Sequence, residues 1–257
     1  MTTDFVSCTD VDSEHFRTAI IATLGPGSWD EPVLEQLIHA GATIFRLNFS
    51  HGDESSHAET LSRVRRVADR LGASIGVLGD LPGPKIRLTE VSDGGIDLAS
   101  GDRLVFVRGL EGSEIVDDEV RVGCTLDAIF SDVEVGQRIL IDDGLVRLVA
   151  RECDADRLVC QVEVSGRISS HKGVNLPDTD LDIELPTQRD LQFATWSIEH
   201  DLDWVAMSFV RSADDVLALD DRMRSLAGTE HRPIPIVAKL EVPRAIDHAR
   251  SIADVVD

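Results

Sequence analysis

The stretch FRLNFSHG, residues 45–52, decides the fold because an apolar strand pattern at residues 42–45 turns abruptly polar within it. Arg46, Asn48 and Ser50 alternate with apolar residues, so a β-strand would direct these three side chains to one side. A guanidinium, an amide and a hydroxyl side by side suit an oxyanion held next to a cation. The simpler interpretation is a half-buried edge strand with one polar face, and both interpretations stay open on this stretch alone.

Composition limits the class of protein. The 257 residues suffice for one large domain or two modest ones, and a hydrophobic content of 42% supports a core. No apolar run approaches the length of a membrane span and no signal-peptide pattern opens the chain, so we expect a soluble cytoplasmic protein. The net charge of −22 argues against nucleic acid and anionic lipid as partners. Four scattered cysteines without a CxxC pair predict neither a disulfide framework nor a zinc site.

Lysine is rare in this chain. Lys85, Lys172 and Lys239 are the only three, and every other basic side chain is arginine. A composition that disfavours lysine is expected to keep it where a compact ammonium is needed. Each of the three lies beside glycine, proline or strand signals, so each is a candidate site residue. A solvent-exposed lysine is the alternative in each case.

The first part of the chain alternates between strand and helix patterns. Apolar strands are predicted at 18–24, from 42 into the stretch that carries Arg46, and at 74–78, with the first and third of them buried, and helices follow the first two. Ser28 or Asp30 caps the first helix, and the second runs from about 55 to 71. This order predicts a parallel sheet with helical crossovers and a site at the carboxyl ends of the strands.

Residues 88–170 have a different pattern, with short alternating segments, many turns and no helical periodicity of useful length. A hairpin is predicted from 138 to 150 around a turn at 142–144. We therefore expect a small all-β domain inserted after the third strand.

The strand–helix order resumes near residue 187. Strands are predicted at 203–209 and 234–240 and a last helix at 243–253, with capping boxes of Thr187 with Asp190 and Ser212 with Asp215. The helix that begins with the Ser212 and Asp215 capping box is expected to bury Val216, Leu219, Met223 and Leu226.

Five strand–helix units make an incomplete (β/α)8 barrel. The predicted class is α/β, a partial TIM barrel cut short at its C-terminal end, with an inserted small all-β lid domain. The predicted divisions are a loose N-terminal arm (1–17), a first barrel part (18–87), the lid (88–170) and a second barrel part (171–257).

Seven motifs occur in an order and spacing that resemble pyruvate kinase from about residue 17 onward. They are TLGPGS (23–28), RLNFSHG (46–52), GPKIR (83–87), DDGL (142–145), KGVNLP (172–177), SFVR (208–211) and AKLE (238–241). The resemblance implies a barrel with a lid that transfers a phosphoryl group from phosphoenolpyruvate to ADP, giving pyruvate and ATP in the last step of glycolysis. It also implies a need for Mg²⁺ or Mn²⁺ and, in the full-length family, a homotetramer.

The resemblance assigns roles by position. Arg46 matches the arginine that binds the substrate phosphate, and Lys239 matches the catalytic lysine that steadies the transferring group. Glu241 matches one carboxylate ligand of the divalent metal, although a salt-bridged loop glutamate is the simpler interpretation. Nucleotide contacts are implied for Asn48, His51, Arg87 and Lys172, with a structural role almost equally compatible with His51. Asp142 and Asp143 could reach the site, but a hairpin turn explains them as well.

One departure from the family concerns a monovalent cation. The family commonly holds K⁺ near a glutamate, and here Lys85 occupies that position while Leu81 replaces a threonine. The matching K⁺ site consists of Asn48, Ser50, Asp80 and the Leu81 carbonyl. An ammonium can take the electrostatic role of K⁺, and two neighbouring cations would repel. We predict that K⁺ is not required, with a solvent-directed Lys85 as the alternative.

A second departure is that the family's Gly-Asp-Leu-Gly segment, with its second metal carboxylate, would fall beyond Asp257. The expectation is half a metal site and little turnover from these 257 residues. Two other functions stay open: a non-catalytic phosphate- or nucleotide-binding remnant, and another phosphoenolpyruvate or pyruvate barrel enzyme such as an aldolase-type lyase.

Overall fold

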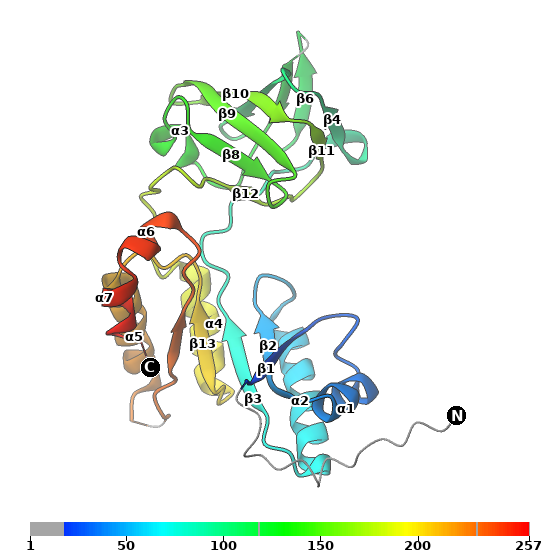
Figure 1. Ribbon diagram of the computed structural model, residues 1–257, viewed down its shortest axis with the longest axis vertical. Coiled ribbons are helices and arrows are strands. Elements are labelled where there is room, and N and C mark those ends of the chain that lie inside the picture. The colour runs from blue at the N-terminus through cyan, green and yellow to red at the C-terminus, as the bar shows by residue number, and fades with distance from the viewer. Residues whose placement is uncertain (1–17, 118, 230, 257) are drawn as a thin grey trace. The chain divides into compact units, whose positions relative to one another are not determined.

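The computed structural model describes residues 18–117, 119–229 and 231–256, so the expected N-terminal arm lies outside the described residues. The chain forms two compact units. The first, here called the α/β unit, comprises the described residues of Met1–Gly83 and Pro186–Asp257, and the second, the inserted unit, comprises those of Pro84–Leu185. Figure 1 shows this division by colour, with blue, cyan, yellow and red segments in the α/β unit and green segments in the inserted unit.

The α/β unit is built on a parallel five-stranded sheet of order β1-β2-β3-β13-β14. Its strands are β1 (Ile20–Leu24), β2 (Ala42–Asn48), β3 (Gly76–Asp80), β13 (Trp204–Met207) and β14 (Ile236–Ala238). The parallel sheet predicted from the strand–helix order is therefore present. Within the described residues the sheet is open, with β1 and β14 at its edges rather than paired with each other.

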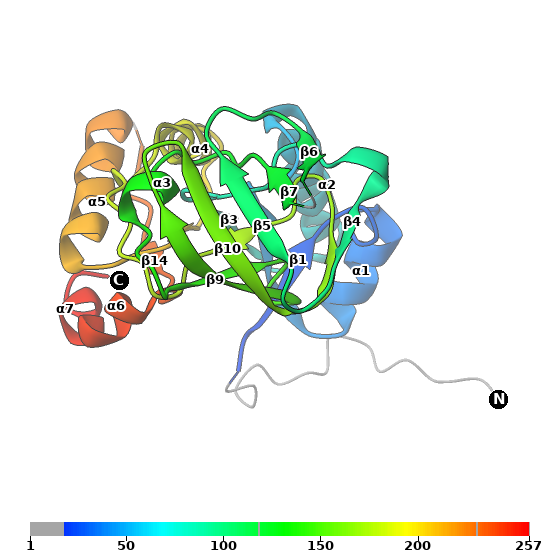
Figure 2. The same ribbon diagram turned by 90° about the horizontal axis from the view of Figure 1, so that it is seen from above.

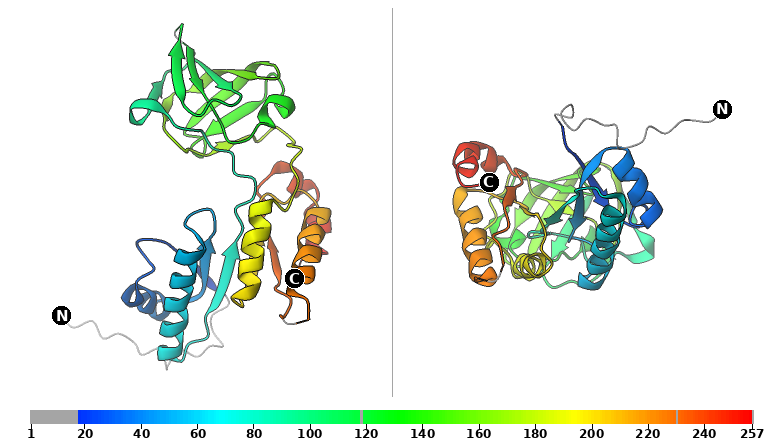
Figure 3. Two further views of the ribbon diagram at one scale, coloured as in Figure 1. Left: turned by 180° about the vertical axis from the view of Figure 1, so that it is seen from behind. Right: turned by 90° about the horizontal axis from the view of Figure 1, so that it is seen from below.

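Six helices of the α/β unit lie among the described residues: α1 (Glu31–His39), α2 (Glu54–Leu71), α4 (Gln188–Glu199), α5 (Ala213–Ala227), α6 (Pro243–Asp247) and α7 (Ala249–Ala253). Helix α1 packs beside α2, and α4 packs beside α5. These four helices cover one face of the sheet (Figure 3). The predicted capping box of Thr187 with Asp190 opens α4. No helix in the described part of the chain combines the length and apolar character needed to cross a bilayer.

Three local predictions were wrong. Strand β1 is not buried, because it lies at a sheet edge, and Ile20 and Ile21 are 48% and 52% exposed. The helix expected at 243–253 is divided into α6 and α7 at His248. In α5, Ala227 is buried and Leu226 is 48% exposed. At 100° per residue Ala227 lies only about 20° from Val216 around the helix, whereas Leu226 lies about 80° away.

The inserted unit is almost entirely β-structure. Its seven-stranded sheet has the order β12-β8-β9-β10-β5-β7-β6, and β11 pairs with β4 in a separate two-stranded sheet. All pairs are antiparallel except β5 with β7, and β9, β10 and β5 lie side by side (Figure 2). The strands are β4 (Ile96–Leu98), β5 (Arg103–Val107), β6 (Ser113–Val116), β7 (Glu119–Val122), β8 (Arg138–Ile141), β9 (Val146–Cys153), β10 (Arg157–Val164), β11 (Gly166–Ile168) and β12 (Val174–Asn175).

The core of the inserted unit is apolar and closed, with Leu104, Phe106, Ile139, Leu148 and Leu158 all fully buried. The predicted hairpin is present as β8 and β9. Two short helical turns, η2 (Ser92–Gly94) and α3 (Ile129–Asp132), interrupt the region where helical periodicity was not detected, because three or four residues are too few to show it. The unit runs from Pro84 to Leu185, because β12 pairs with β8 after residue 170 and Arg87 forms a bridge with Gly173 before residue 88.

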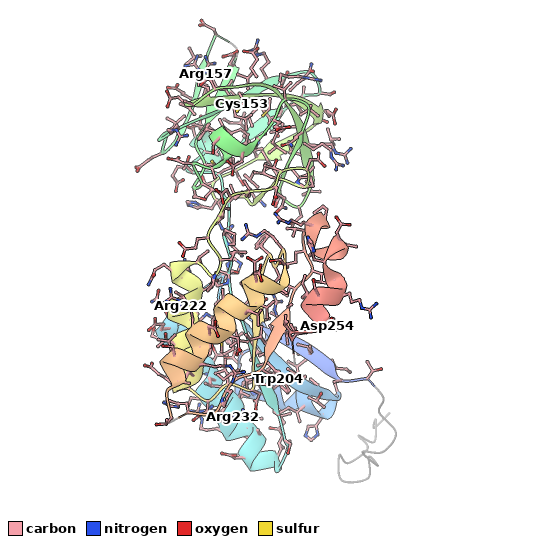
Figure 4. The ribbon with its side chains drawn as sticks, turned by 90° about the vertical axis from the view of Figure 1, so that its left-hand side faces the viewer. Cys153, Arg157, Trp204, Arg222, Arg232 and Asp254 are labelled. Atoms are coloured by element: carbon pink, nitrogen blue, oxygen red, sulfur yellow. The ribbon has the colours of Figure 1, made fainter. Side chains whose placement is uncertain are left out.

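The two ends of the parallel sheet differ in character. Figure 4 labels Trp204, the first residue of β13, and Arg232, which pairs with the residue before it. Asp203, the residue before β13, accepts the Val77 amide of β3 at 2.8 Å and pairs with Arg232 at 3.2 Å. These contacts join the segments at the amino end of the sheet. The carboxyl end carries the candidate site.

Candidate anion-binding site

The predicted site residues of the α/β unit gather at the carboxyl ends of its parallel strands. Arg46 and Asn48 lie in the last part of β2, Asp80 ends β3, and Lys239 directly follows β14. The register places Asn48 opposite Asp80 and Asp80 opposite Ala206, so β2, β3 and β13 end at one level. Parallel strands bring their carboxyl ends to the same edge of a sheet, which is where ligands bind in such folds.

Asp80 is the centre of this edge, and its side chain is 2% exposed. Arg46 donates its Nε–H to Asp80 Oδ2 at 2.7 Å, and its Nη2 contacts the same oxygen. Lys239 Nζ lies 3.0 Å from the other oxygen, Oδ1. Two cations from strands far apart in the sequence therefore meet at one buried carboxylate.

The alternation predicted for β2 explains how Arg46 reaches this position. Leu47 and Phe49 are 1% and 0% exposed, whereas Arg46, Asn48 and Ser50 on the other side are only partly buried. Arg46 also donates from Nη1 to Thr23 Oγ1 of β1 at 3.0 Å. These bonds use three of the five N–H donors of a guanidinium, and the side chain is 32% exposed, so an anion can reach its outer edge.

Glu241 continues the charge network. Its Oε1 lies 3.2 Å from Lys239 Nζ, and its Oε2 accepts the Phe209 amide at 3.1 Å. Phe209 has a φ of 58°, a conformation that is rare for a bulky residue. The strained backbone directly after β13 thus aims an N–H group at this carboxylate.

The loop after β2 is held by a turn and a buried histidine. Asn48 Oδ1 accepts the Ser50 amide at 3.1 Å, so the polar side chains after β2 form an Asx-type turn. His57 Nε2 lies 2.8 Å from the His51 carbonyl, which requires the tautomer that donates from Nε2. Its ring lies against Phe49, Phe193 and Trp196, and this burial lowers the pKa of His57 below its usual value.

Arg87, Lys172 and Lys85 belong to the inserted unit. Arg87 and Lys172 both form polar contacts there. Arg87 Nη1 donates to the His171 carbonyl at 2.6 Å, and Lys172 Nζ lies 2.7 Å from Asp142 Oδ2. Asp142 and Asp143 both have a left-handed φ of 54°, as the turn interpretation requires. The pairing of Asp142 with Lys172 was missed by the sequence analysis, although a turn carboxylate and a rare lysine were both recognised.

Comparison with known proteins identifies the family. A family model described as the pyruvate kinase barrel domain matches residues 15–257. The chain belongs to the pyruvate kinase family. It is 39% identical over 241 residues to a pyruvate kinase of Agrobacterium vitis, 37% over 237 residues to that of Mycobacterium tuberculosis, and 36% over 246 residues to pyruvate kinase 2 of Synechocystis sp.. These matches cover 92% to 94% of this chain but only 40% to 48% of the relatives, so the chain spans less than half the length of these proteins.

A divalent metal, which the pyruvate kinase family implies, finds a partial set of donors here. Glu241 offers a carboxylate that is 38% exposed, and Asp80 offers a second that is occupied by Arg46 and Lys239. Mg²⁺ is commonly bound by one or two carboxylates together with water and substrate phosphate oxygens. No group of three potential ligands from His, Cys, Asp and Glu occurs among the residues that the structure describes. The described residues therefore offer one accessible carboxylate ligand, Glu241, and the remaining ligands of a metal would be water and substrate phosphate oxygens.

The residues of the α/β unit that were predicted to hold a monovalent cation lie at the ends of the neighbouring strands β2 and β3. Asn48 is in register with Asp80, and the Phe49 amide donates to the Asp80 carbonyl at 3.0 Å. The Leu81 carbonyl accepts the buried Ser208 hydroxyl at 2.6 Å. Ser208 belongs to the SFVR motif, and its contact with Leu81 was not predicted.

Proposed function

We propose that this chain is the phosphoenolpyruvate-binding part of a pyruvate kinase, with Arg46 and Lys239 as the groups that bind the transferring phosphoryl group. The observation that carries the proposal is the convergence of both cations on Asp80 at the carboxyl edge of the sheet. Phosphoryl transfer depends on positioning and charge neutralisation more than on covalent help from the protein. Asp80 supplies the positioning, because it holds both cations before substrate arrives.

In the proposed reaction an oxygen of the ADP β-phosphate attacks phosphorus as the bond from phosphorus to the enol oxygen breaks. ATP and the enolate of pyruvate result, and the enolate carbon then takes up a proton. The fork of Arg46 fits two oxygens of the phosphoryl group, and the ammonium of Lys239 lies where it can neutralise the charge on the group in flight. Glu241 would hold the divalent ion, whose chemistry is to neutralise phosphate charge.

The finer assignments rest on the family motifs. Asn48, His51, Arg87 and Lys172 are proposed nucleotide contacts. For Arg87 and Lys172 the support is that Arg87 bonds the carbonyl of His171, the residue before Lys172, and that Lys172 pairs with Asp142. The inserted unit is proposed to act as a lid, and the five parallel strands to be part of a (β/α)8 barrel. Lys85 is proposed to replace K⁺, so that K⁺ is not required. A tetramer is expected from the resemblance.

A phosphate- or nucleotide-binding module without catalysis is the second candidate, favoured by the observation that Asp80 is already paired with Arg46 and Lys239, which leaves Glu241 as the carboxylate of this charge network that is offered to a metal. Calorimetric titration of the chain with phosphoenolpyruvate and Mg²⁺ tests binding, and ADP-dependent pyruvate release tests turnover in the complete gene product. Binding with release supports the kinase, and binding without release supports the module. No binding by the chain together with no pyruvate release by the complete gene product would overturn the assignment of Arg46 and Lys239.

The matched control for this titration is Arg167, which is 51% exposed and pairs with Asp97 in the inserted unit. The variant Arg167→Lys should bind phosphoenolpyruvate like the unaltered chain, whereas Arg46→Lys should bind it more weakly. Equal affinity in the two variants would show that the guanidinium of Arg46 does not contact the substrate.

A further inference from the structure

The two chain connections to the inserted unit end at the same side chain of the α/β unit. The chain leaves the α/β unit after Gly83 and returns to it at Pro186. Asp190, in the first turn of α4, accepts the Gly83 amide on Oδ1 at 2.8 Å. Its other oxygen, Oδ2, accepts the Thr187 amide at 2.9 Å and the Thr187 hydroxyl at 2.7 Å. One carboxylate thus binds the outgoing and the returning segment.

This arrangement exceeds what a helix cap needs. A capping box is complete with Thr187 and Asp190, which also share the bond from the Asp190 amide to Thr187 Oγ1 at 3.1 Å. The bond from Gly83 joins a residue 107 positions earlier in the chain. Asp190 is 2% exposed, so these bonds are shielded from water and are expensive to leave unmade.

The outgoing segment is fixed by further contacts just before Gly83. The Leu81 amide donates to the Ala206 carbonyl at 2.9 Å, and Ser208 Oγ donates to the Leu81 carbonyl at 2.6 Å. Gly83 has a φ of +63°, and a Cβ atom there would lie 2.7 Å from the Phe209 ring and 3.0 Å from Ser208 Cβ. Residues 81–83 therefore have little freedom relative to the end of β13.

We propose that Asp190 is a positioning residue that pins both connections to one point, so that the inserted unit reorients about a single pivot. Reorientation would then be confined to the segments beyond these bonds, which begin at Pro84 on one side and end at Pro186 on the other. The proposal rests on connectivity and hydrogen bonds, and it does not depend on the catalytic assignment.

Asp215 provides a matched control within the same unit. It occupies the corresponding position in the first turn of α5, is 8% exposed, and accepts the Ser212 amide at 3.2 Å and the Arg211 amide at 2.8 Å. Its bonds are local to α5. Asp215 also pairs with the Arg211 guanidinium at 2.9 Å, so Asp215→Asn disturbs a local helix cap and a local ion pair without touching either connection.

Amide hydrogen exchange, measured by NMR on the full chain, tests the pin directly. Asparagine keeps the shape of Asp190 but has a single acceptor oxygen, so Asp190→Asn cannot accept from both connections. We expect the Gly83 amide, the Thr187 amide or both to exchange about 10- to 100-fold faster, with β2 and β13 unchanged. Asp215→Asn should leave both amides as they are. Unchanged exchange in Asp190→Asn, or an equal gain in Asp215→Asn, would overturn the proposal.

A second variant and a second measurement separate the pin from the cap. Thr187→Val removes only the hydroxyl bonds, so the Gly83 amide should stay protected. A tenfold gain in its exchange rate would show that the cap alone sets its protection.

Nitrogen-15 relaxation then reports the tumbling of each unit. Asp190→Ala, which frees both connections, should increase the difference in correlation time between the two units relative to Asp215→Ala. Equal tumbling in these two variants would show that Asp190 does not restrain the inserted unit.

Discussion

Arg46 and Lys239 contact different oxygens of one buried carboxylate, at 2.7 Å for Arg46 Nε to Asp80 Oδ2 and 3.0 Å for Lys239 Nζ to Asp80 Oδ1. The two cations would otherwise repel each other at this separation, and the repulsion would be strong in a partly buried site. Asp80 therefore makes it possible for both to remain at the edge of the sheet. An anion that binds there meets two positive groups that are already in place.

The first prediction concerns the stability that Asp80 supplies. Asp80→Asn keeps the shape but removes the charge that Arg46 and Lys239 share, and of these two cations only Lys239 then has a second carboxylate among the described residues, Glu241, within 4 Å. Removing one partner of a fully buried ion pair costs about 3–5 kcal/mol. Because Arg46 and Lys239 are 32% and 26% exposed, we expect a smaller loss of about 2 kcal/mol in the free energy of unfolding, measured in urea. The control Asp97→Asn removes a carboxylate that is 78% exposed and should cost less than about 1 kcal/mol. Equal losses would contradict the central role of Asp80.

Local sequence patterns predicted the parts of the site that depend on strand period and rare residues. The alternation in β2 placed Arg46 and Asn48 on the polar side, and the scarcity of lysine drew attention to Lys239 and Lys172. Asp80 was assigned only to a cation site, because nothing local shows that two distant cations share it. The exposure of Ile20 and Ile21 depends on the position of β1 in the sheet order, which no local pattern contains.

The second prediction distinguishes the shape of Arg46 from its charge. Arg46→Lys keeps a positive charge but loses the planar fork that reaches both Asp80 and Thr23. We expect kcat/KM for phosphoenolpyruvate, measured in the complete gene product, to fall about 10- to 100-fold, as the loss of a charge-assisted bidentate contact implies. Arg167→Lys is the control and should retain full activity. A fall in both variants would point to a general effect on folding.

The third prediction concerns the monovalent cation. If the ammonium of Lys85 replaces K⁺, the complete gene product should have the same rate with K⁺ as with tetramethylammonium at fixed ionic strength. Lys85→Glu should restore the acidic residue common in the family and make the rate rise with K⁺ concentration. A strong K⁺ activation of the unaltered protein would contradict the prediction.

The fourth prediction is a pH dependence of stability from His57. Burial lowers its pKa in the folded state, so the unfolded chain binds a proton that the folded chain resists. The free energy of unfolding should therefore fall as the pH is lowered below about 6.5, the usual histidine value, and His57 should contribute no slope well above it. His57→Asn removes the titrating ring, and urea unfolding at several pH values should show a shallower slope below pH ~6.5. The same slope in both proteins would show that other groups determine it.

The fifth prediction separates backbone strain from a steric clash at the connection to the inserted unit. Gly83 and Gly72 have nearly the same left-handed φ, +63° and +61°, but only Gly83 has atoms close to where a Cβ would lie. Gly72→Ala should cost about 1 kcal/mol in the free energy of unfolding, because a left-handed conformation strains alanine. Gly83→Ala has the same strain, and its Cβ would also lie 2.7 Å from the Phe209 ring, so we expect an additional loss of about 1–3 kcal/mol. Because Phe209 donates its amide to Glu241, a shift of its ring should also move the Glu241 side-chain resonances in Gly83→Ala and not in Gly72→Ala. Equal losses of unfolding free energy in the two variants, with no change in the Glu241 resonances, would contradict the prediction. They would show that the Phe209 ring moves aside without cost.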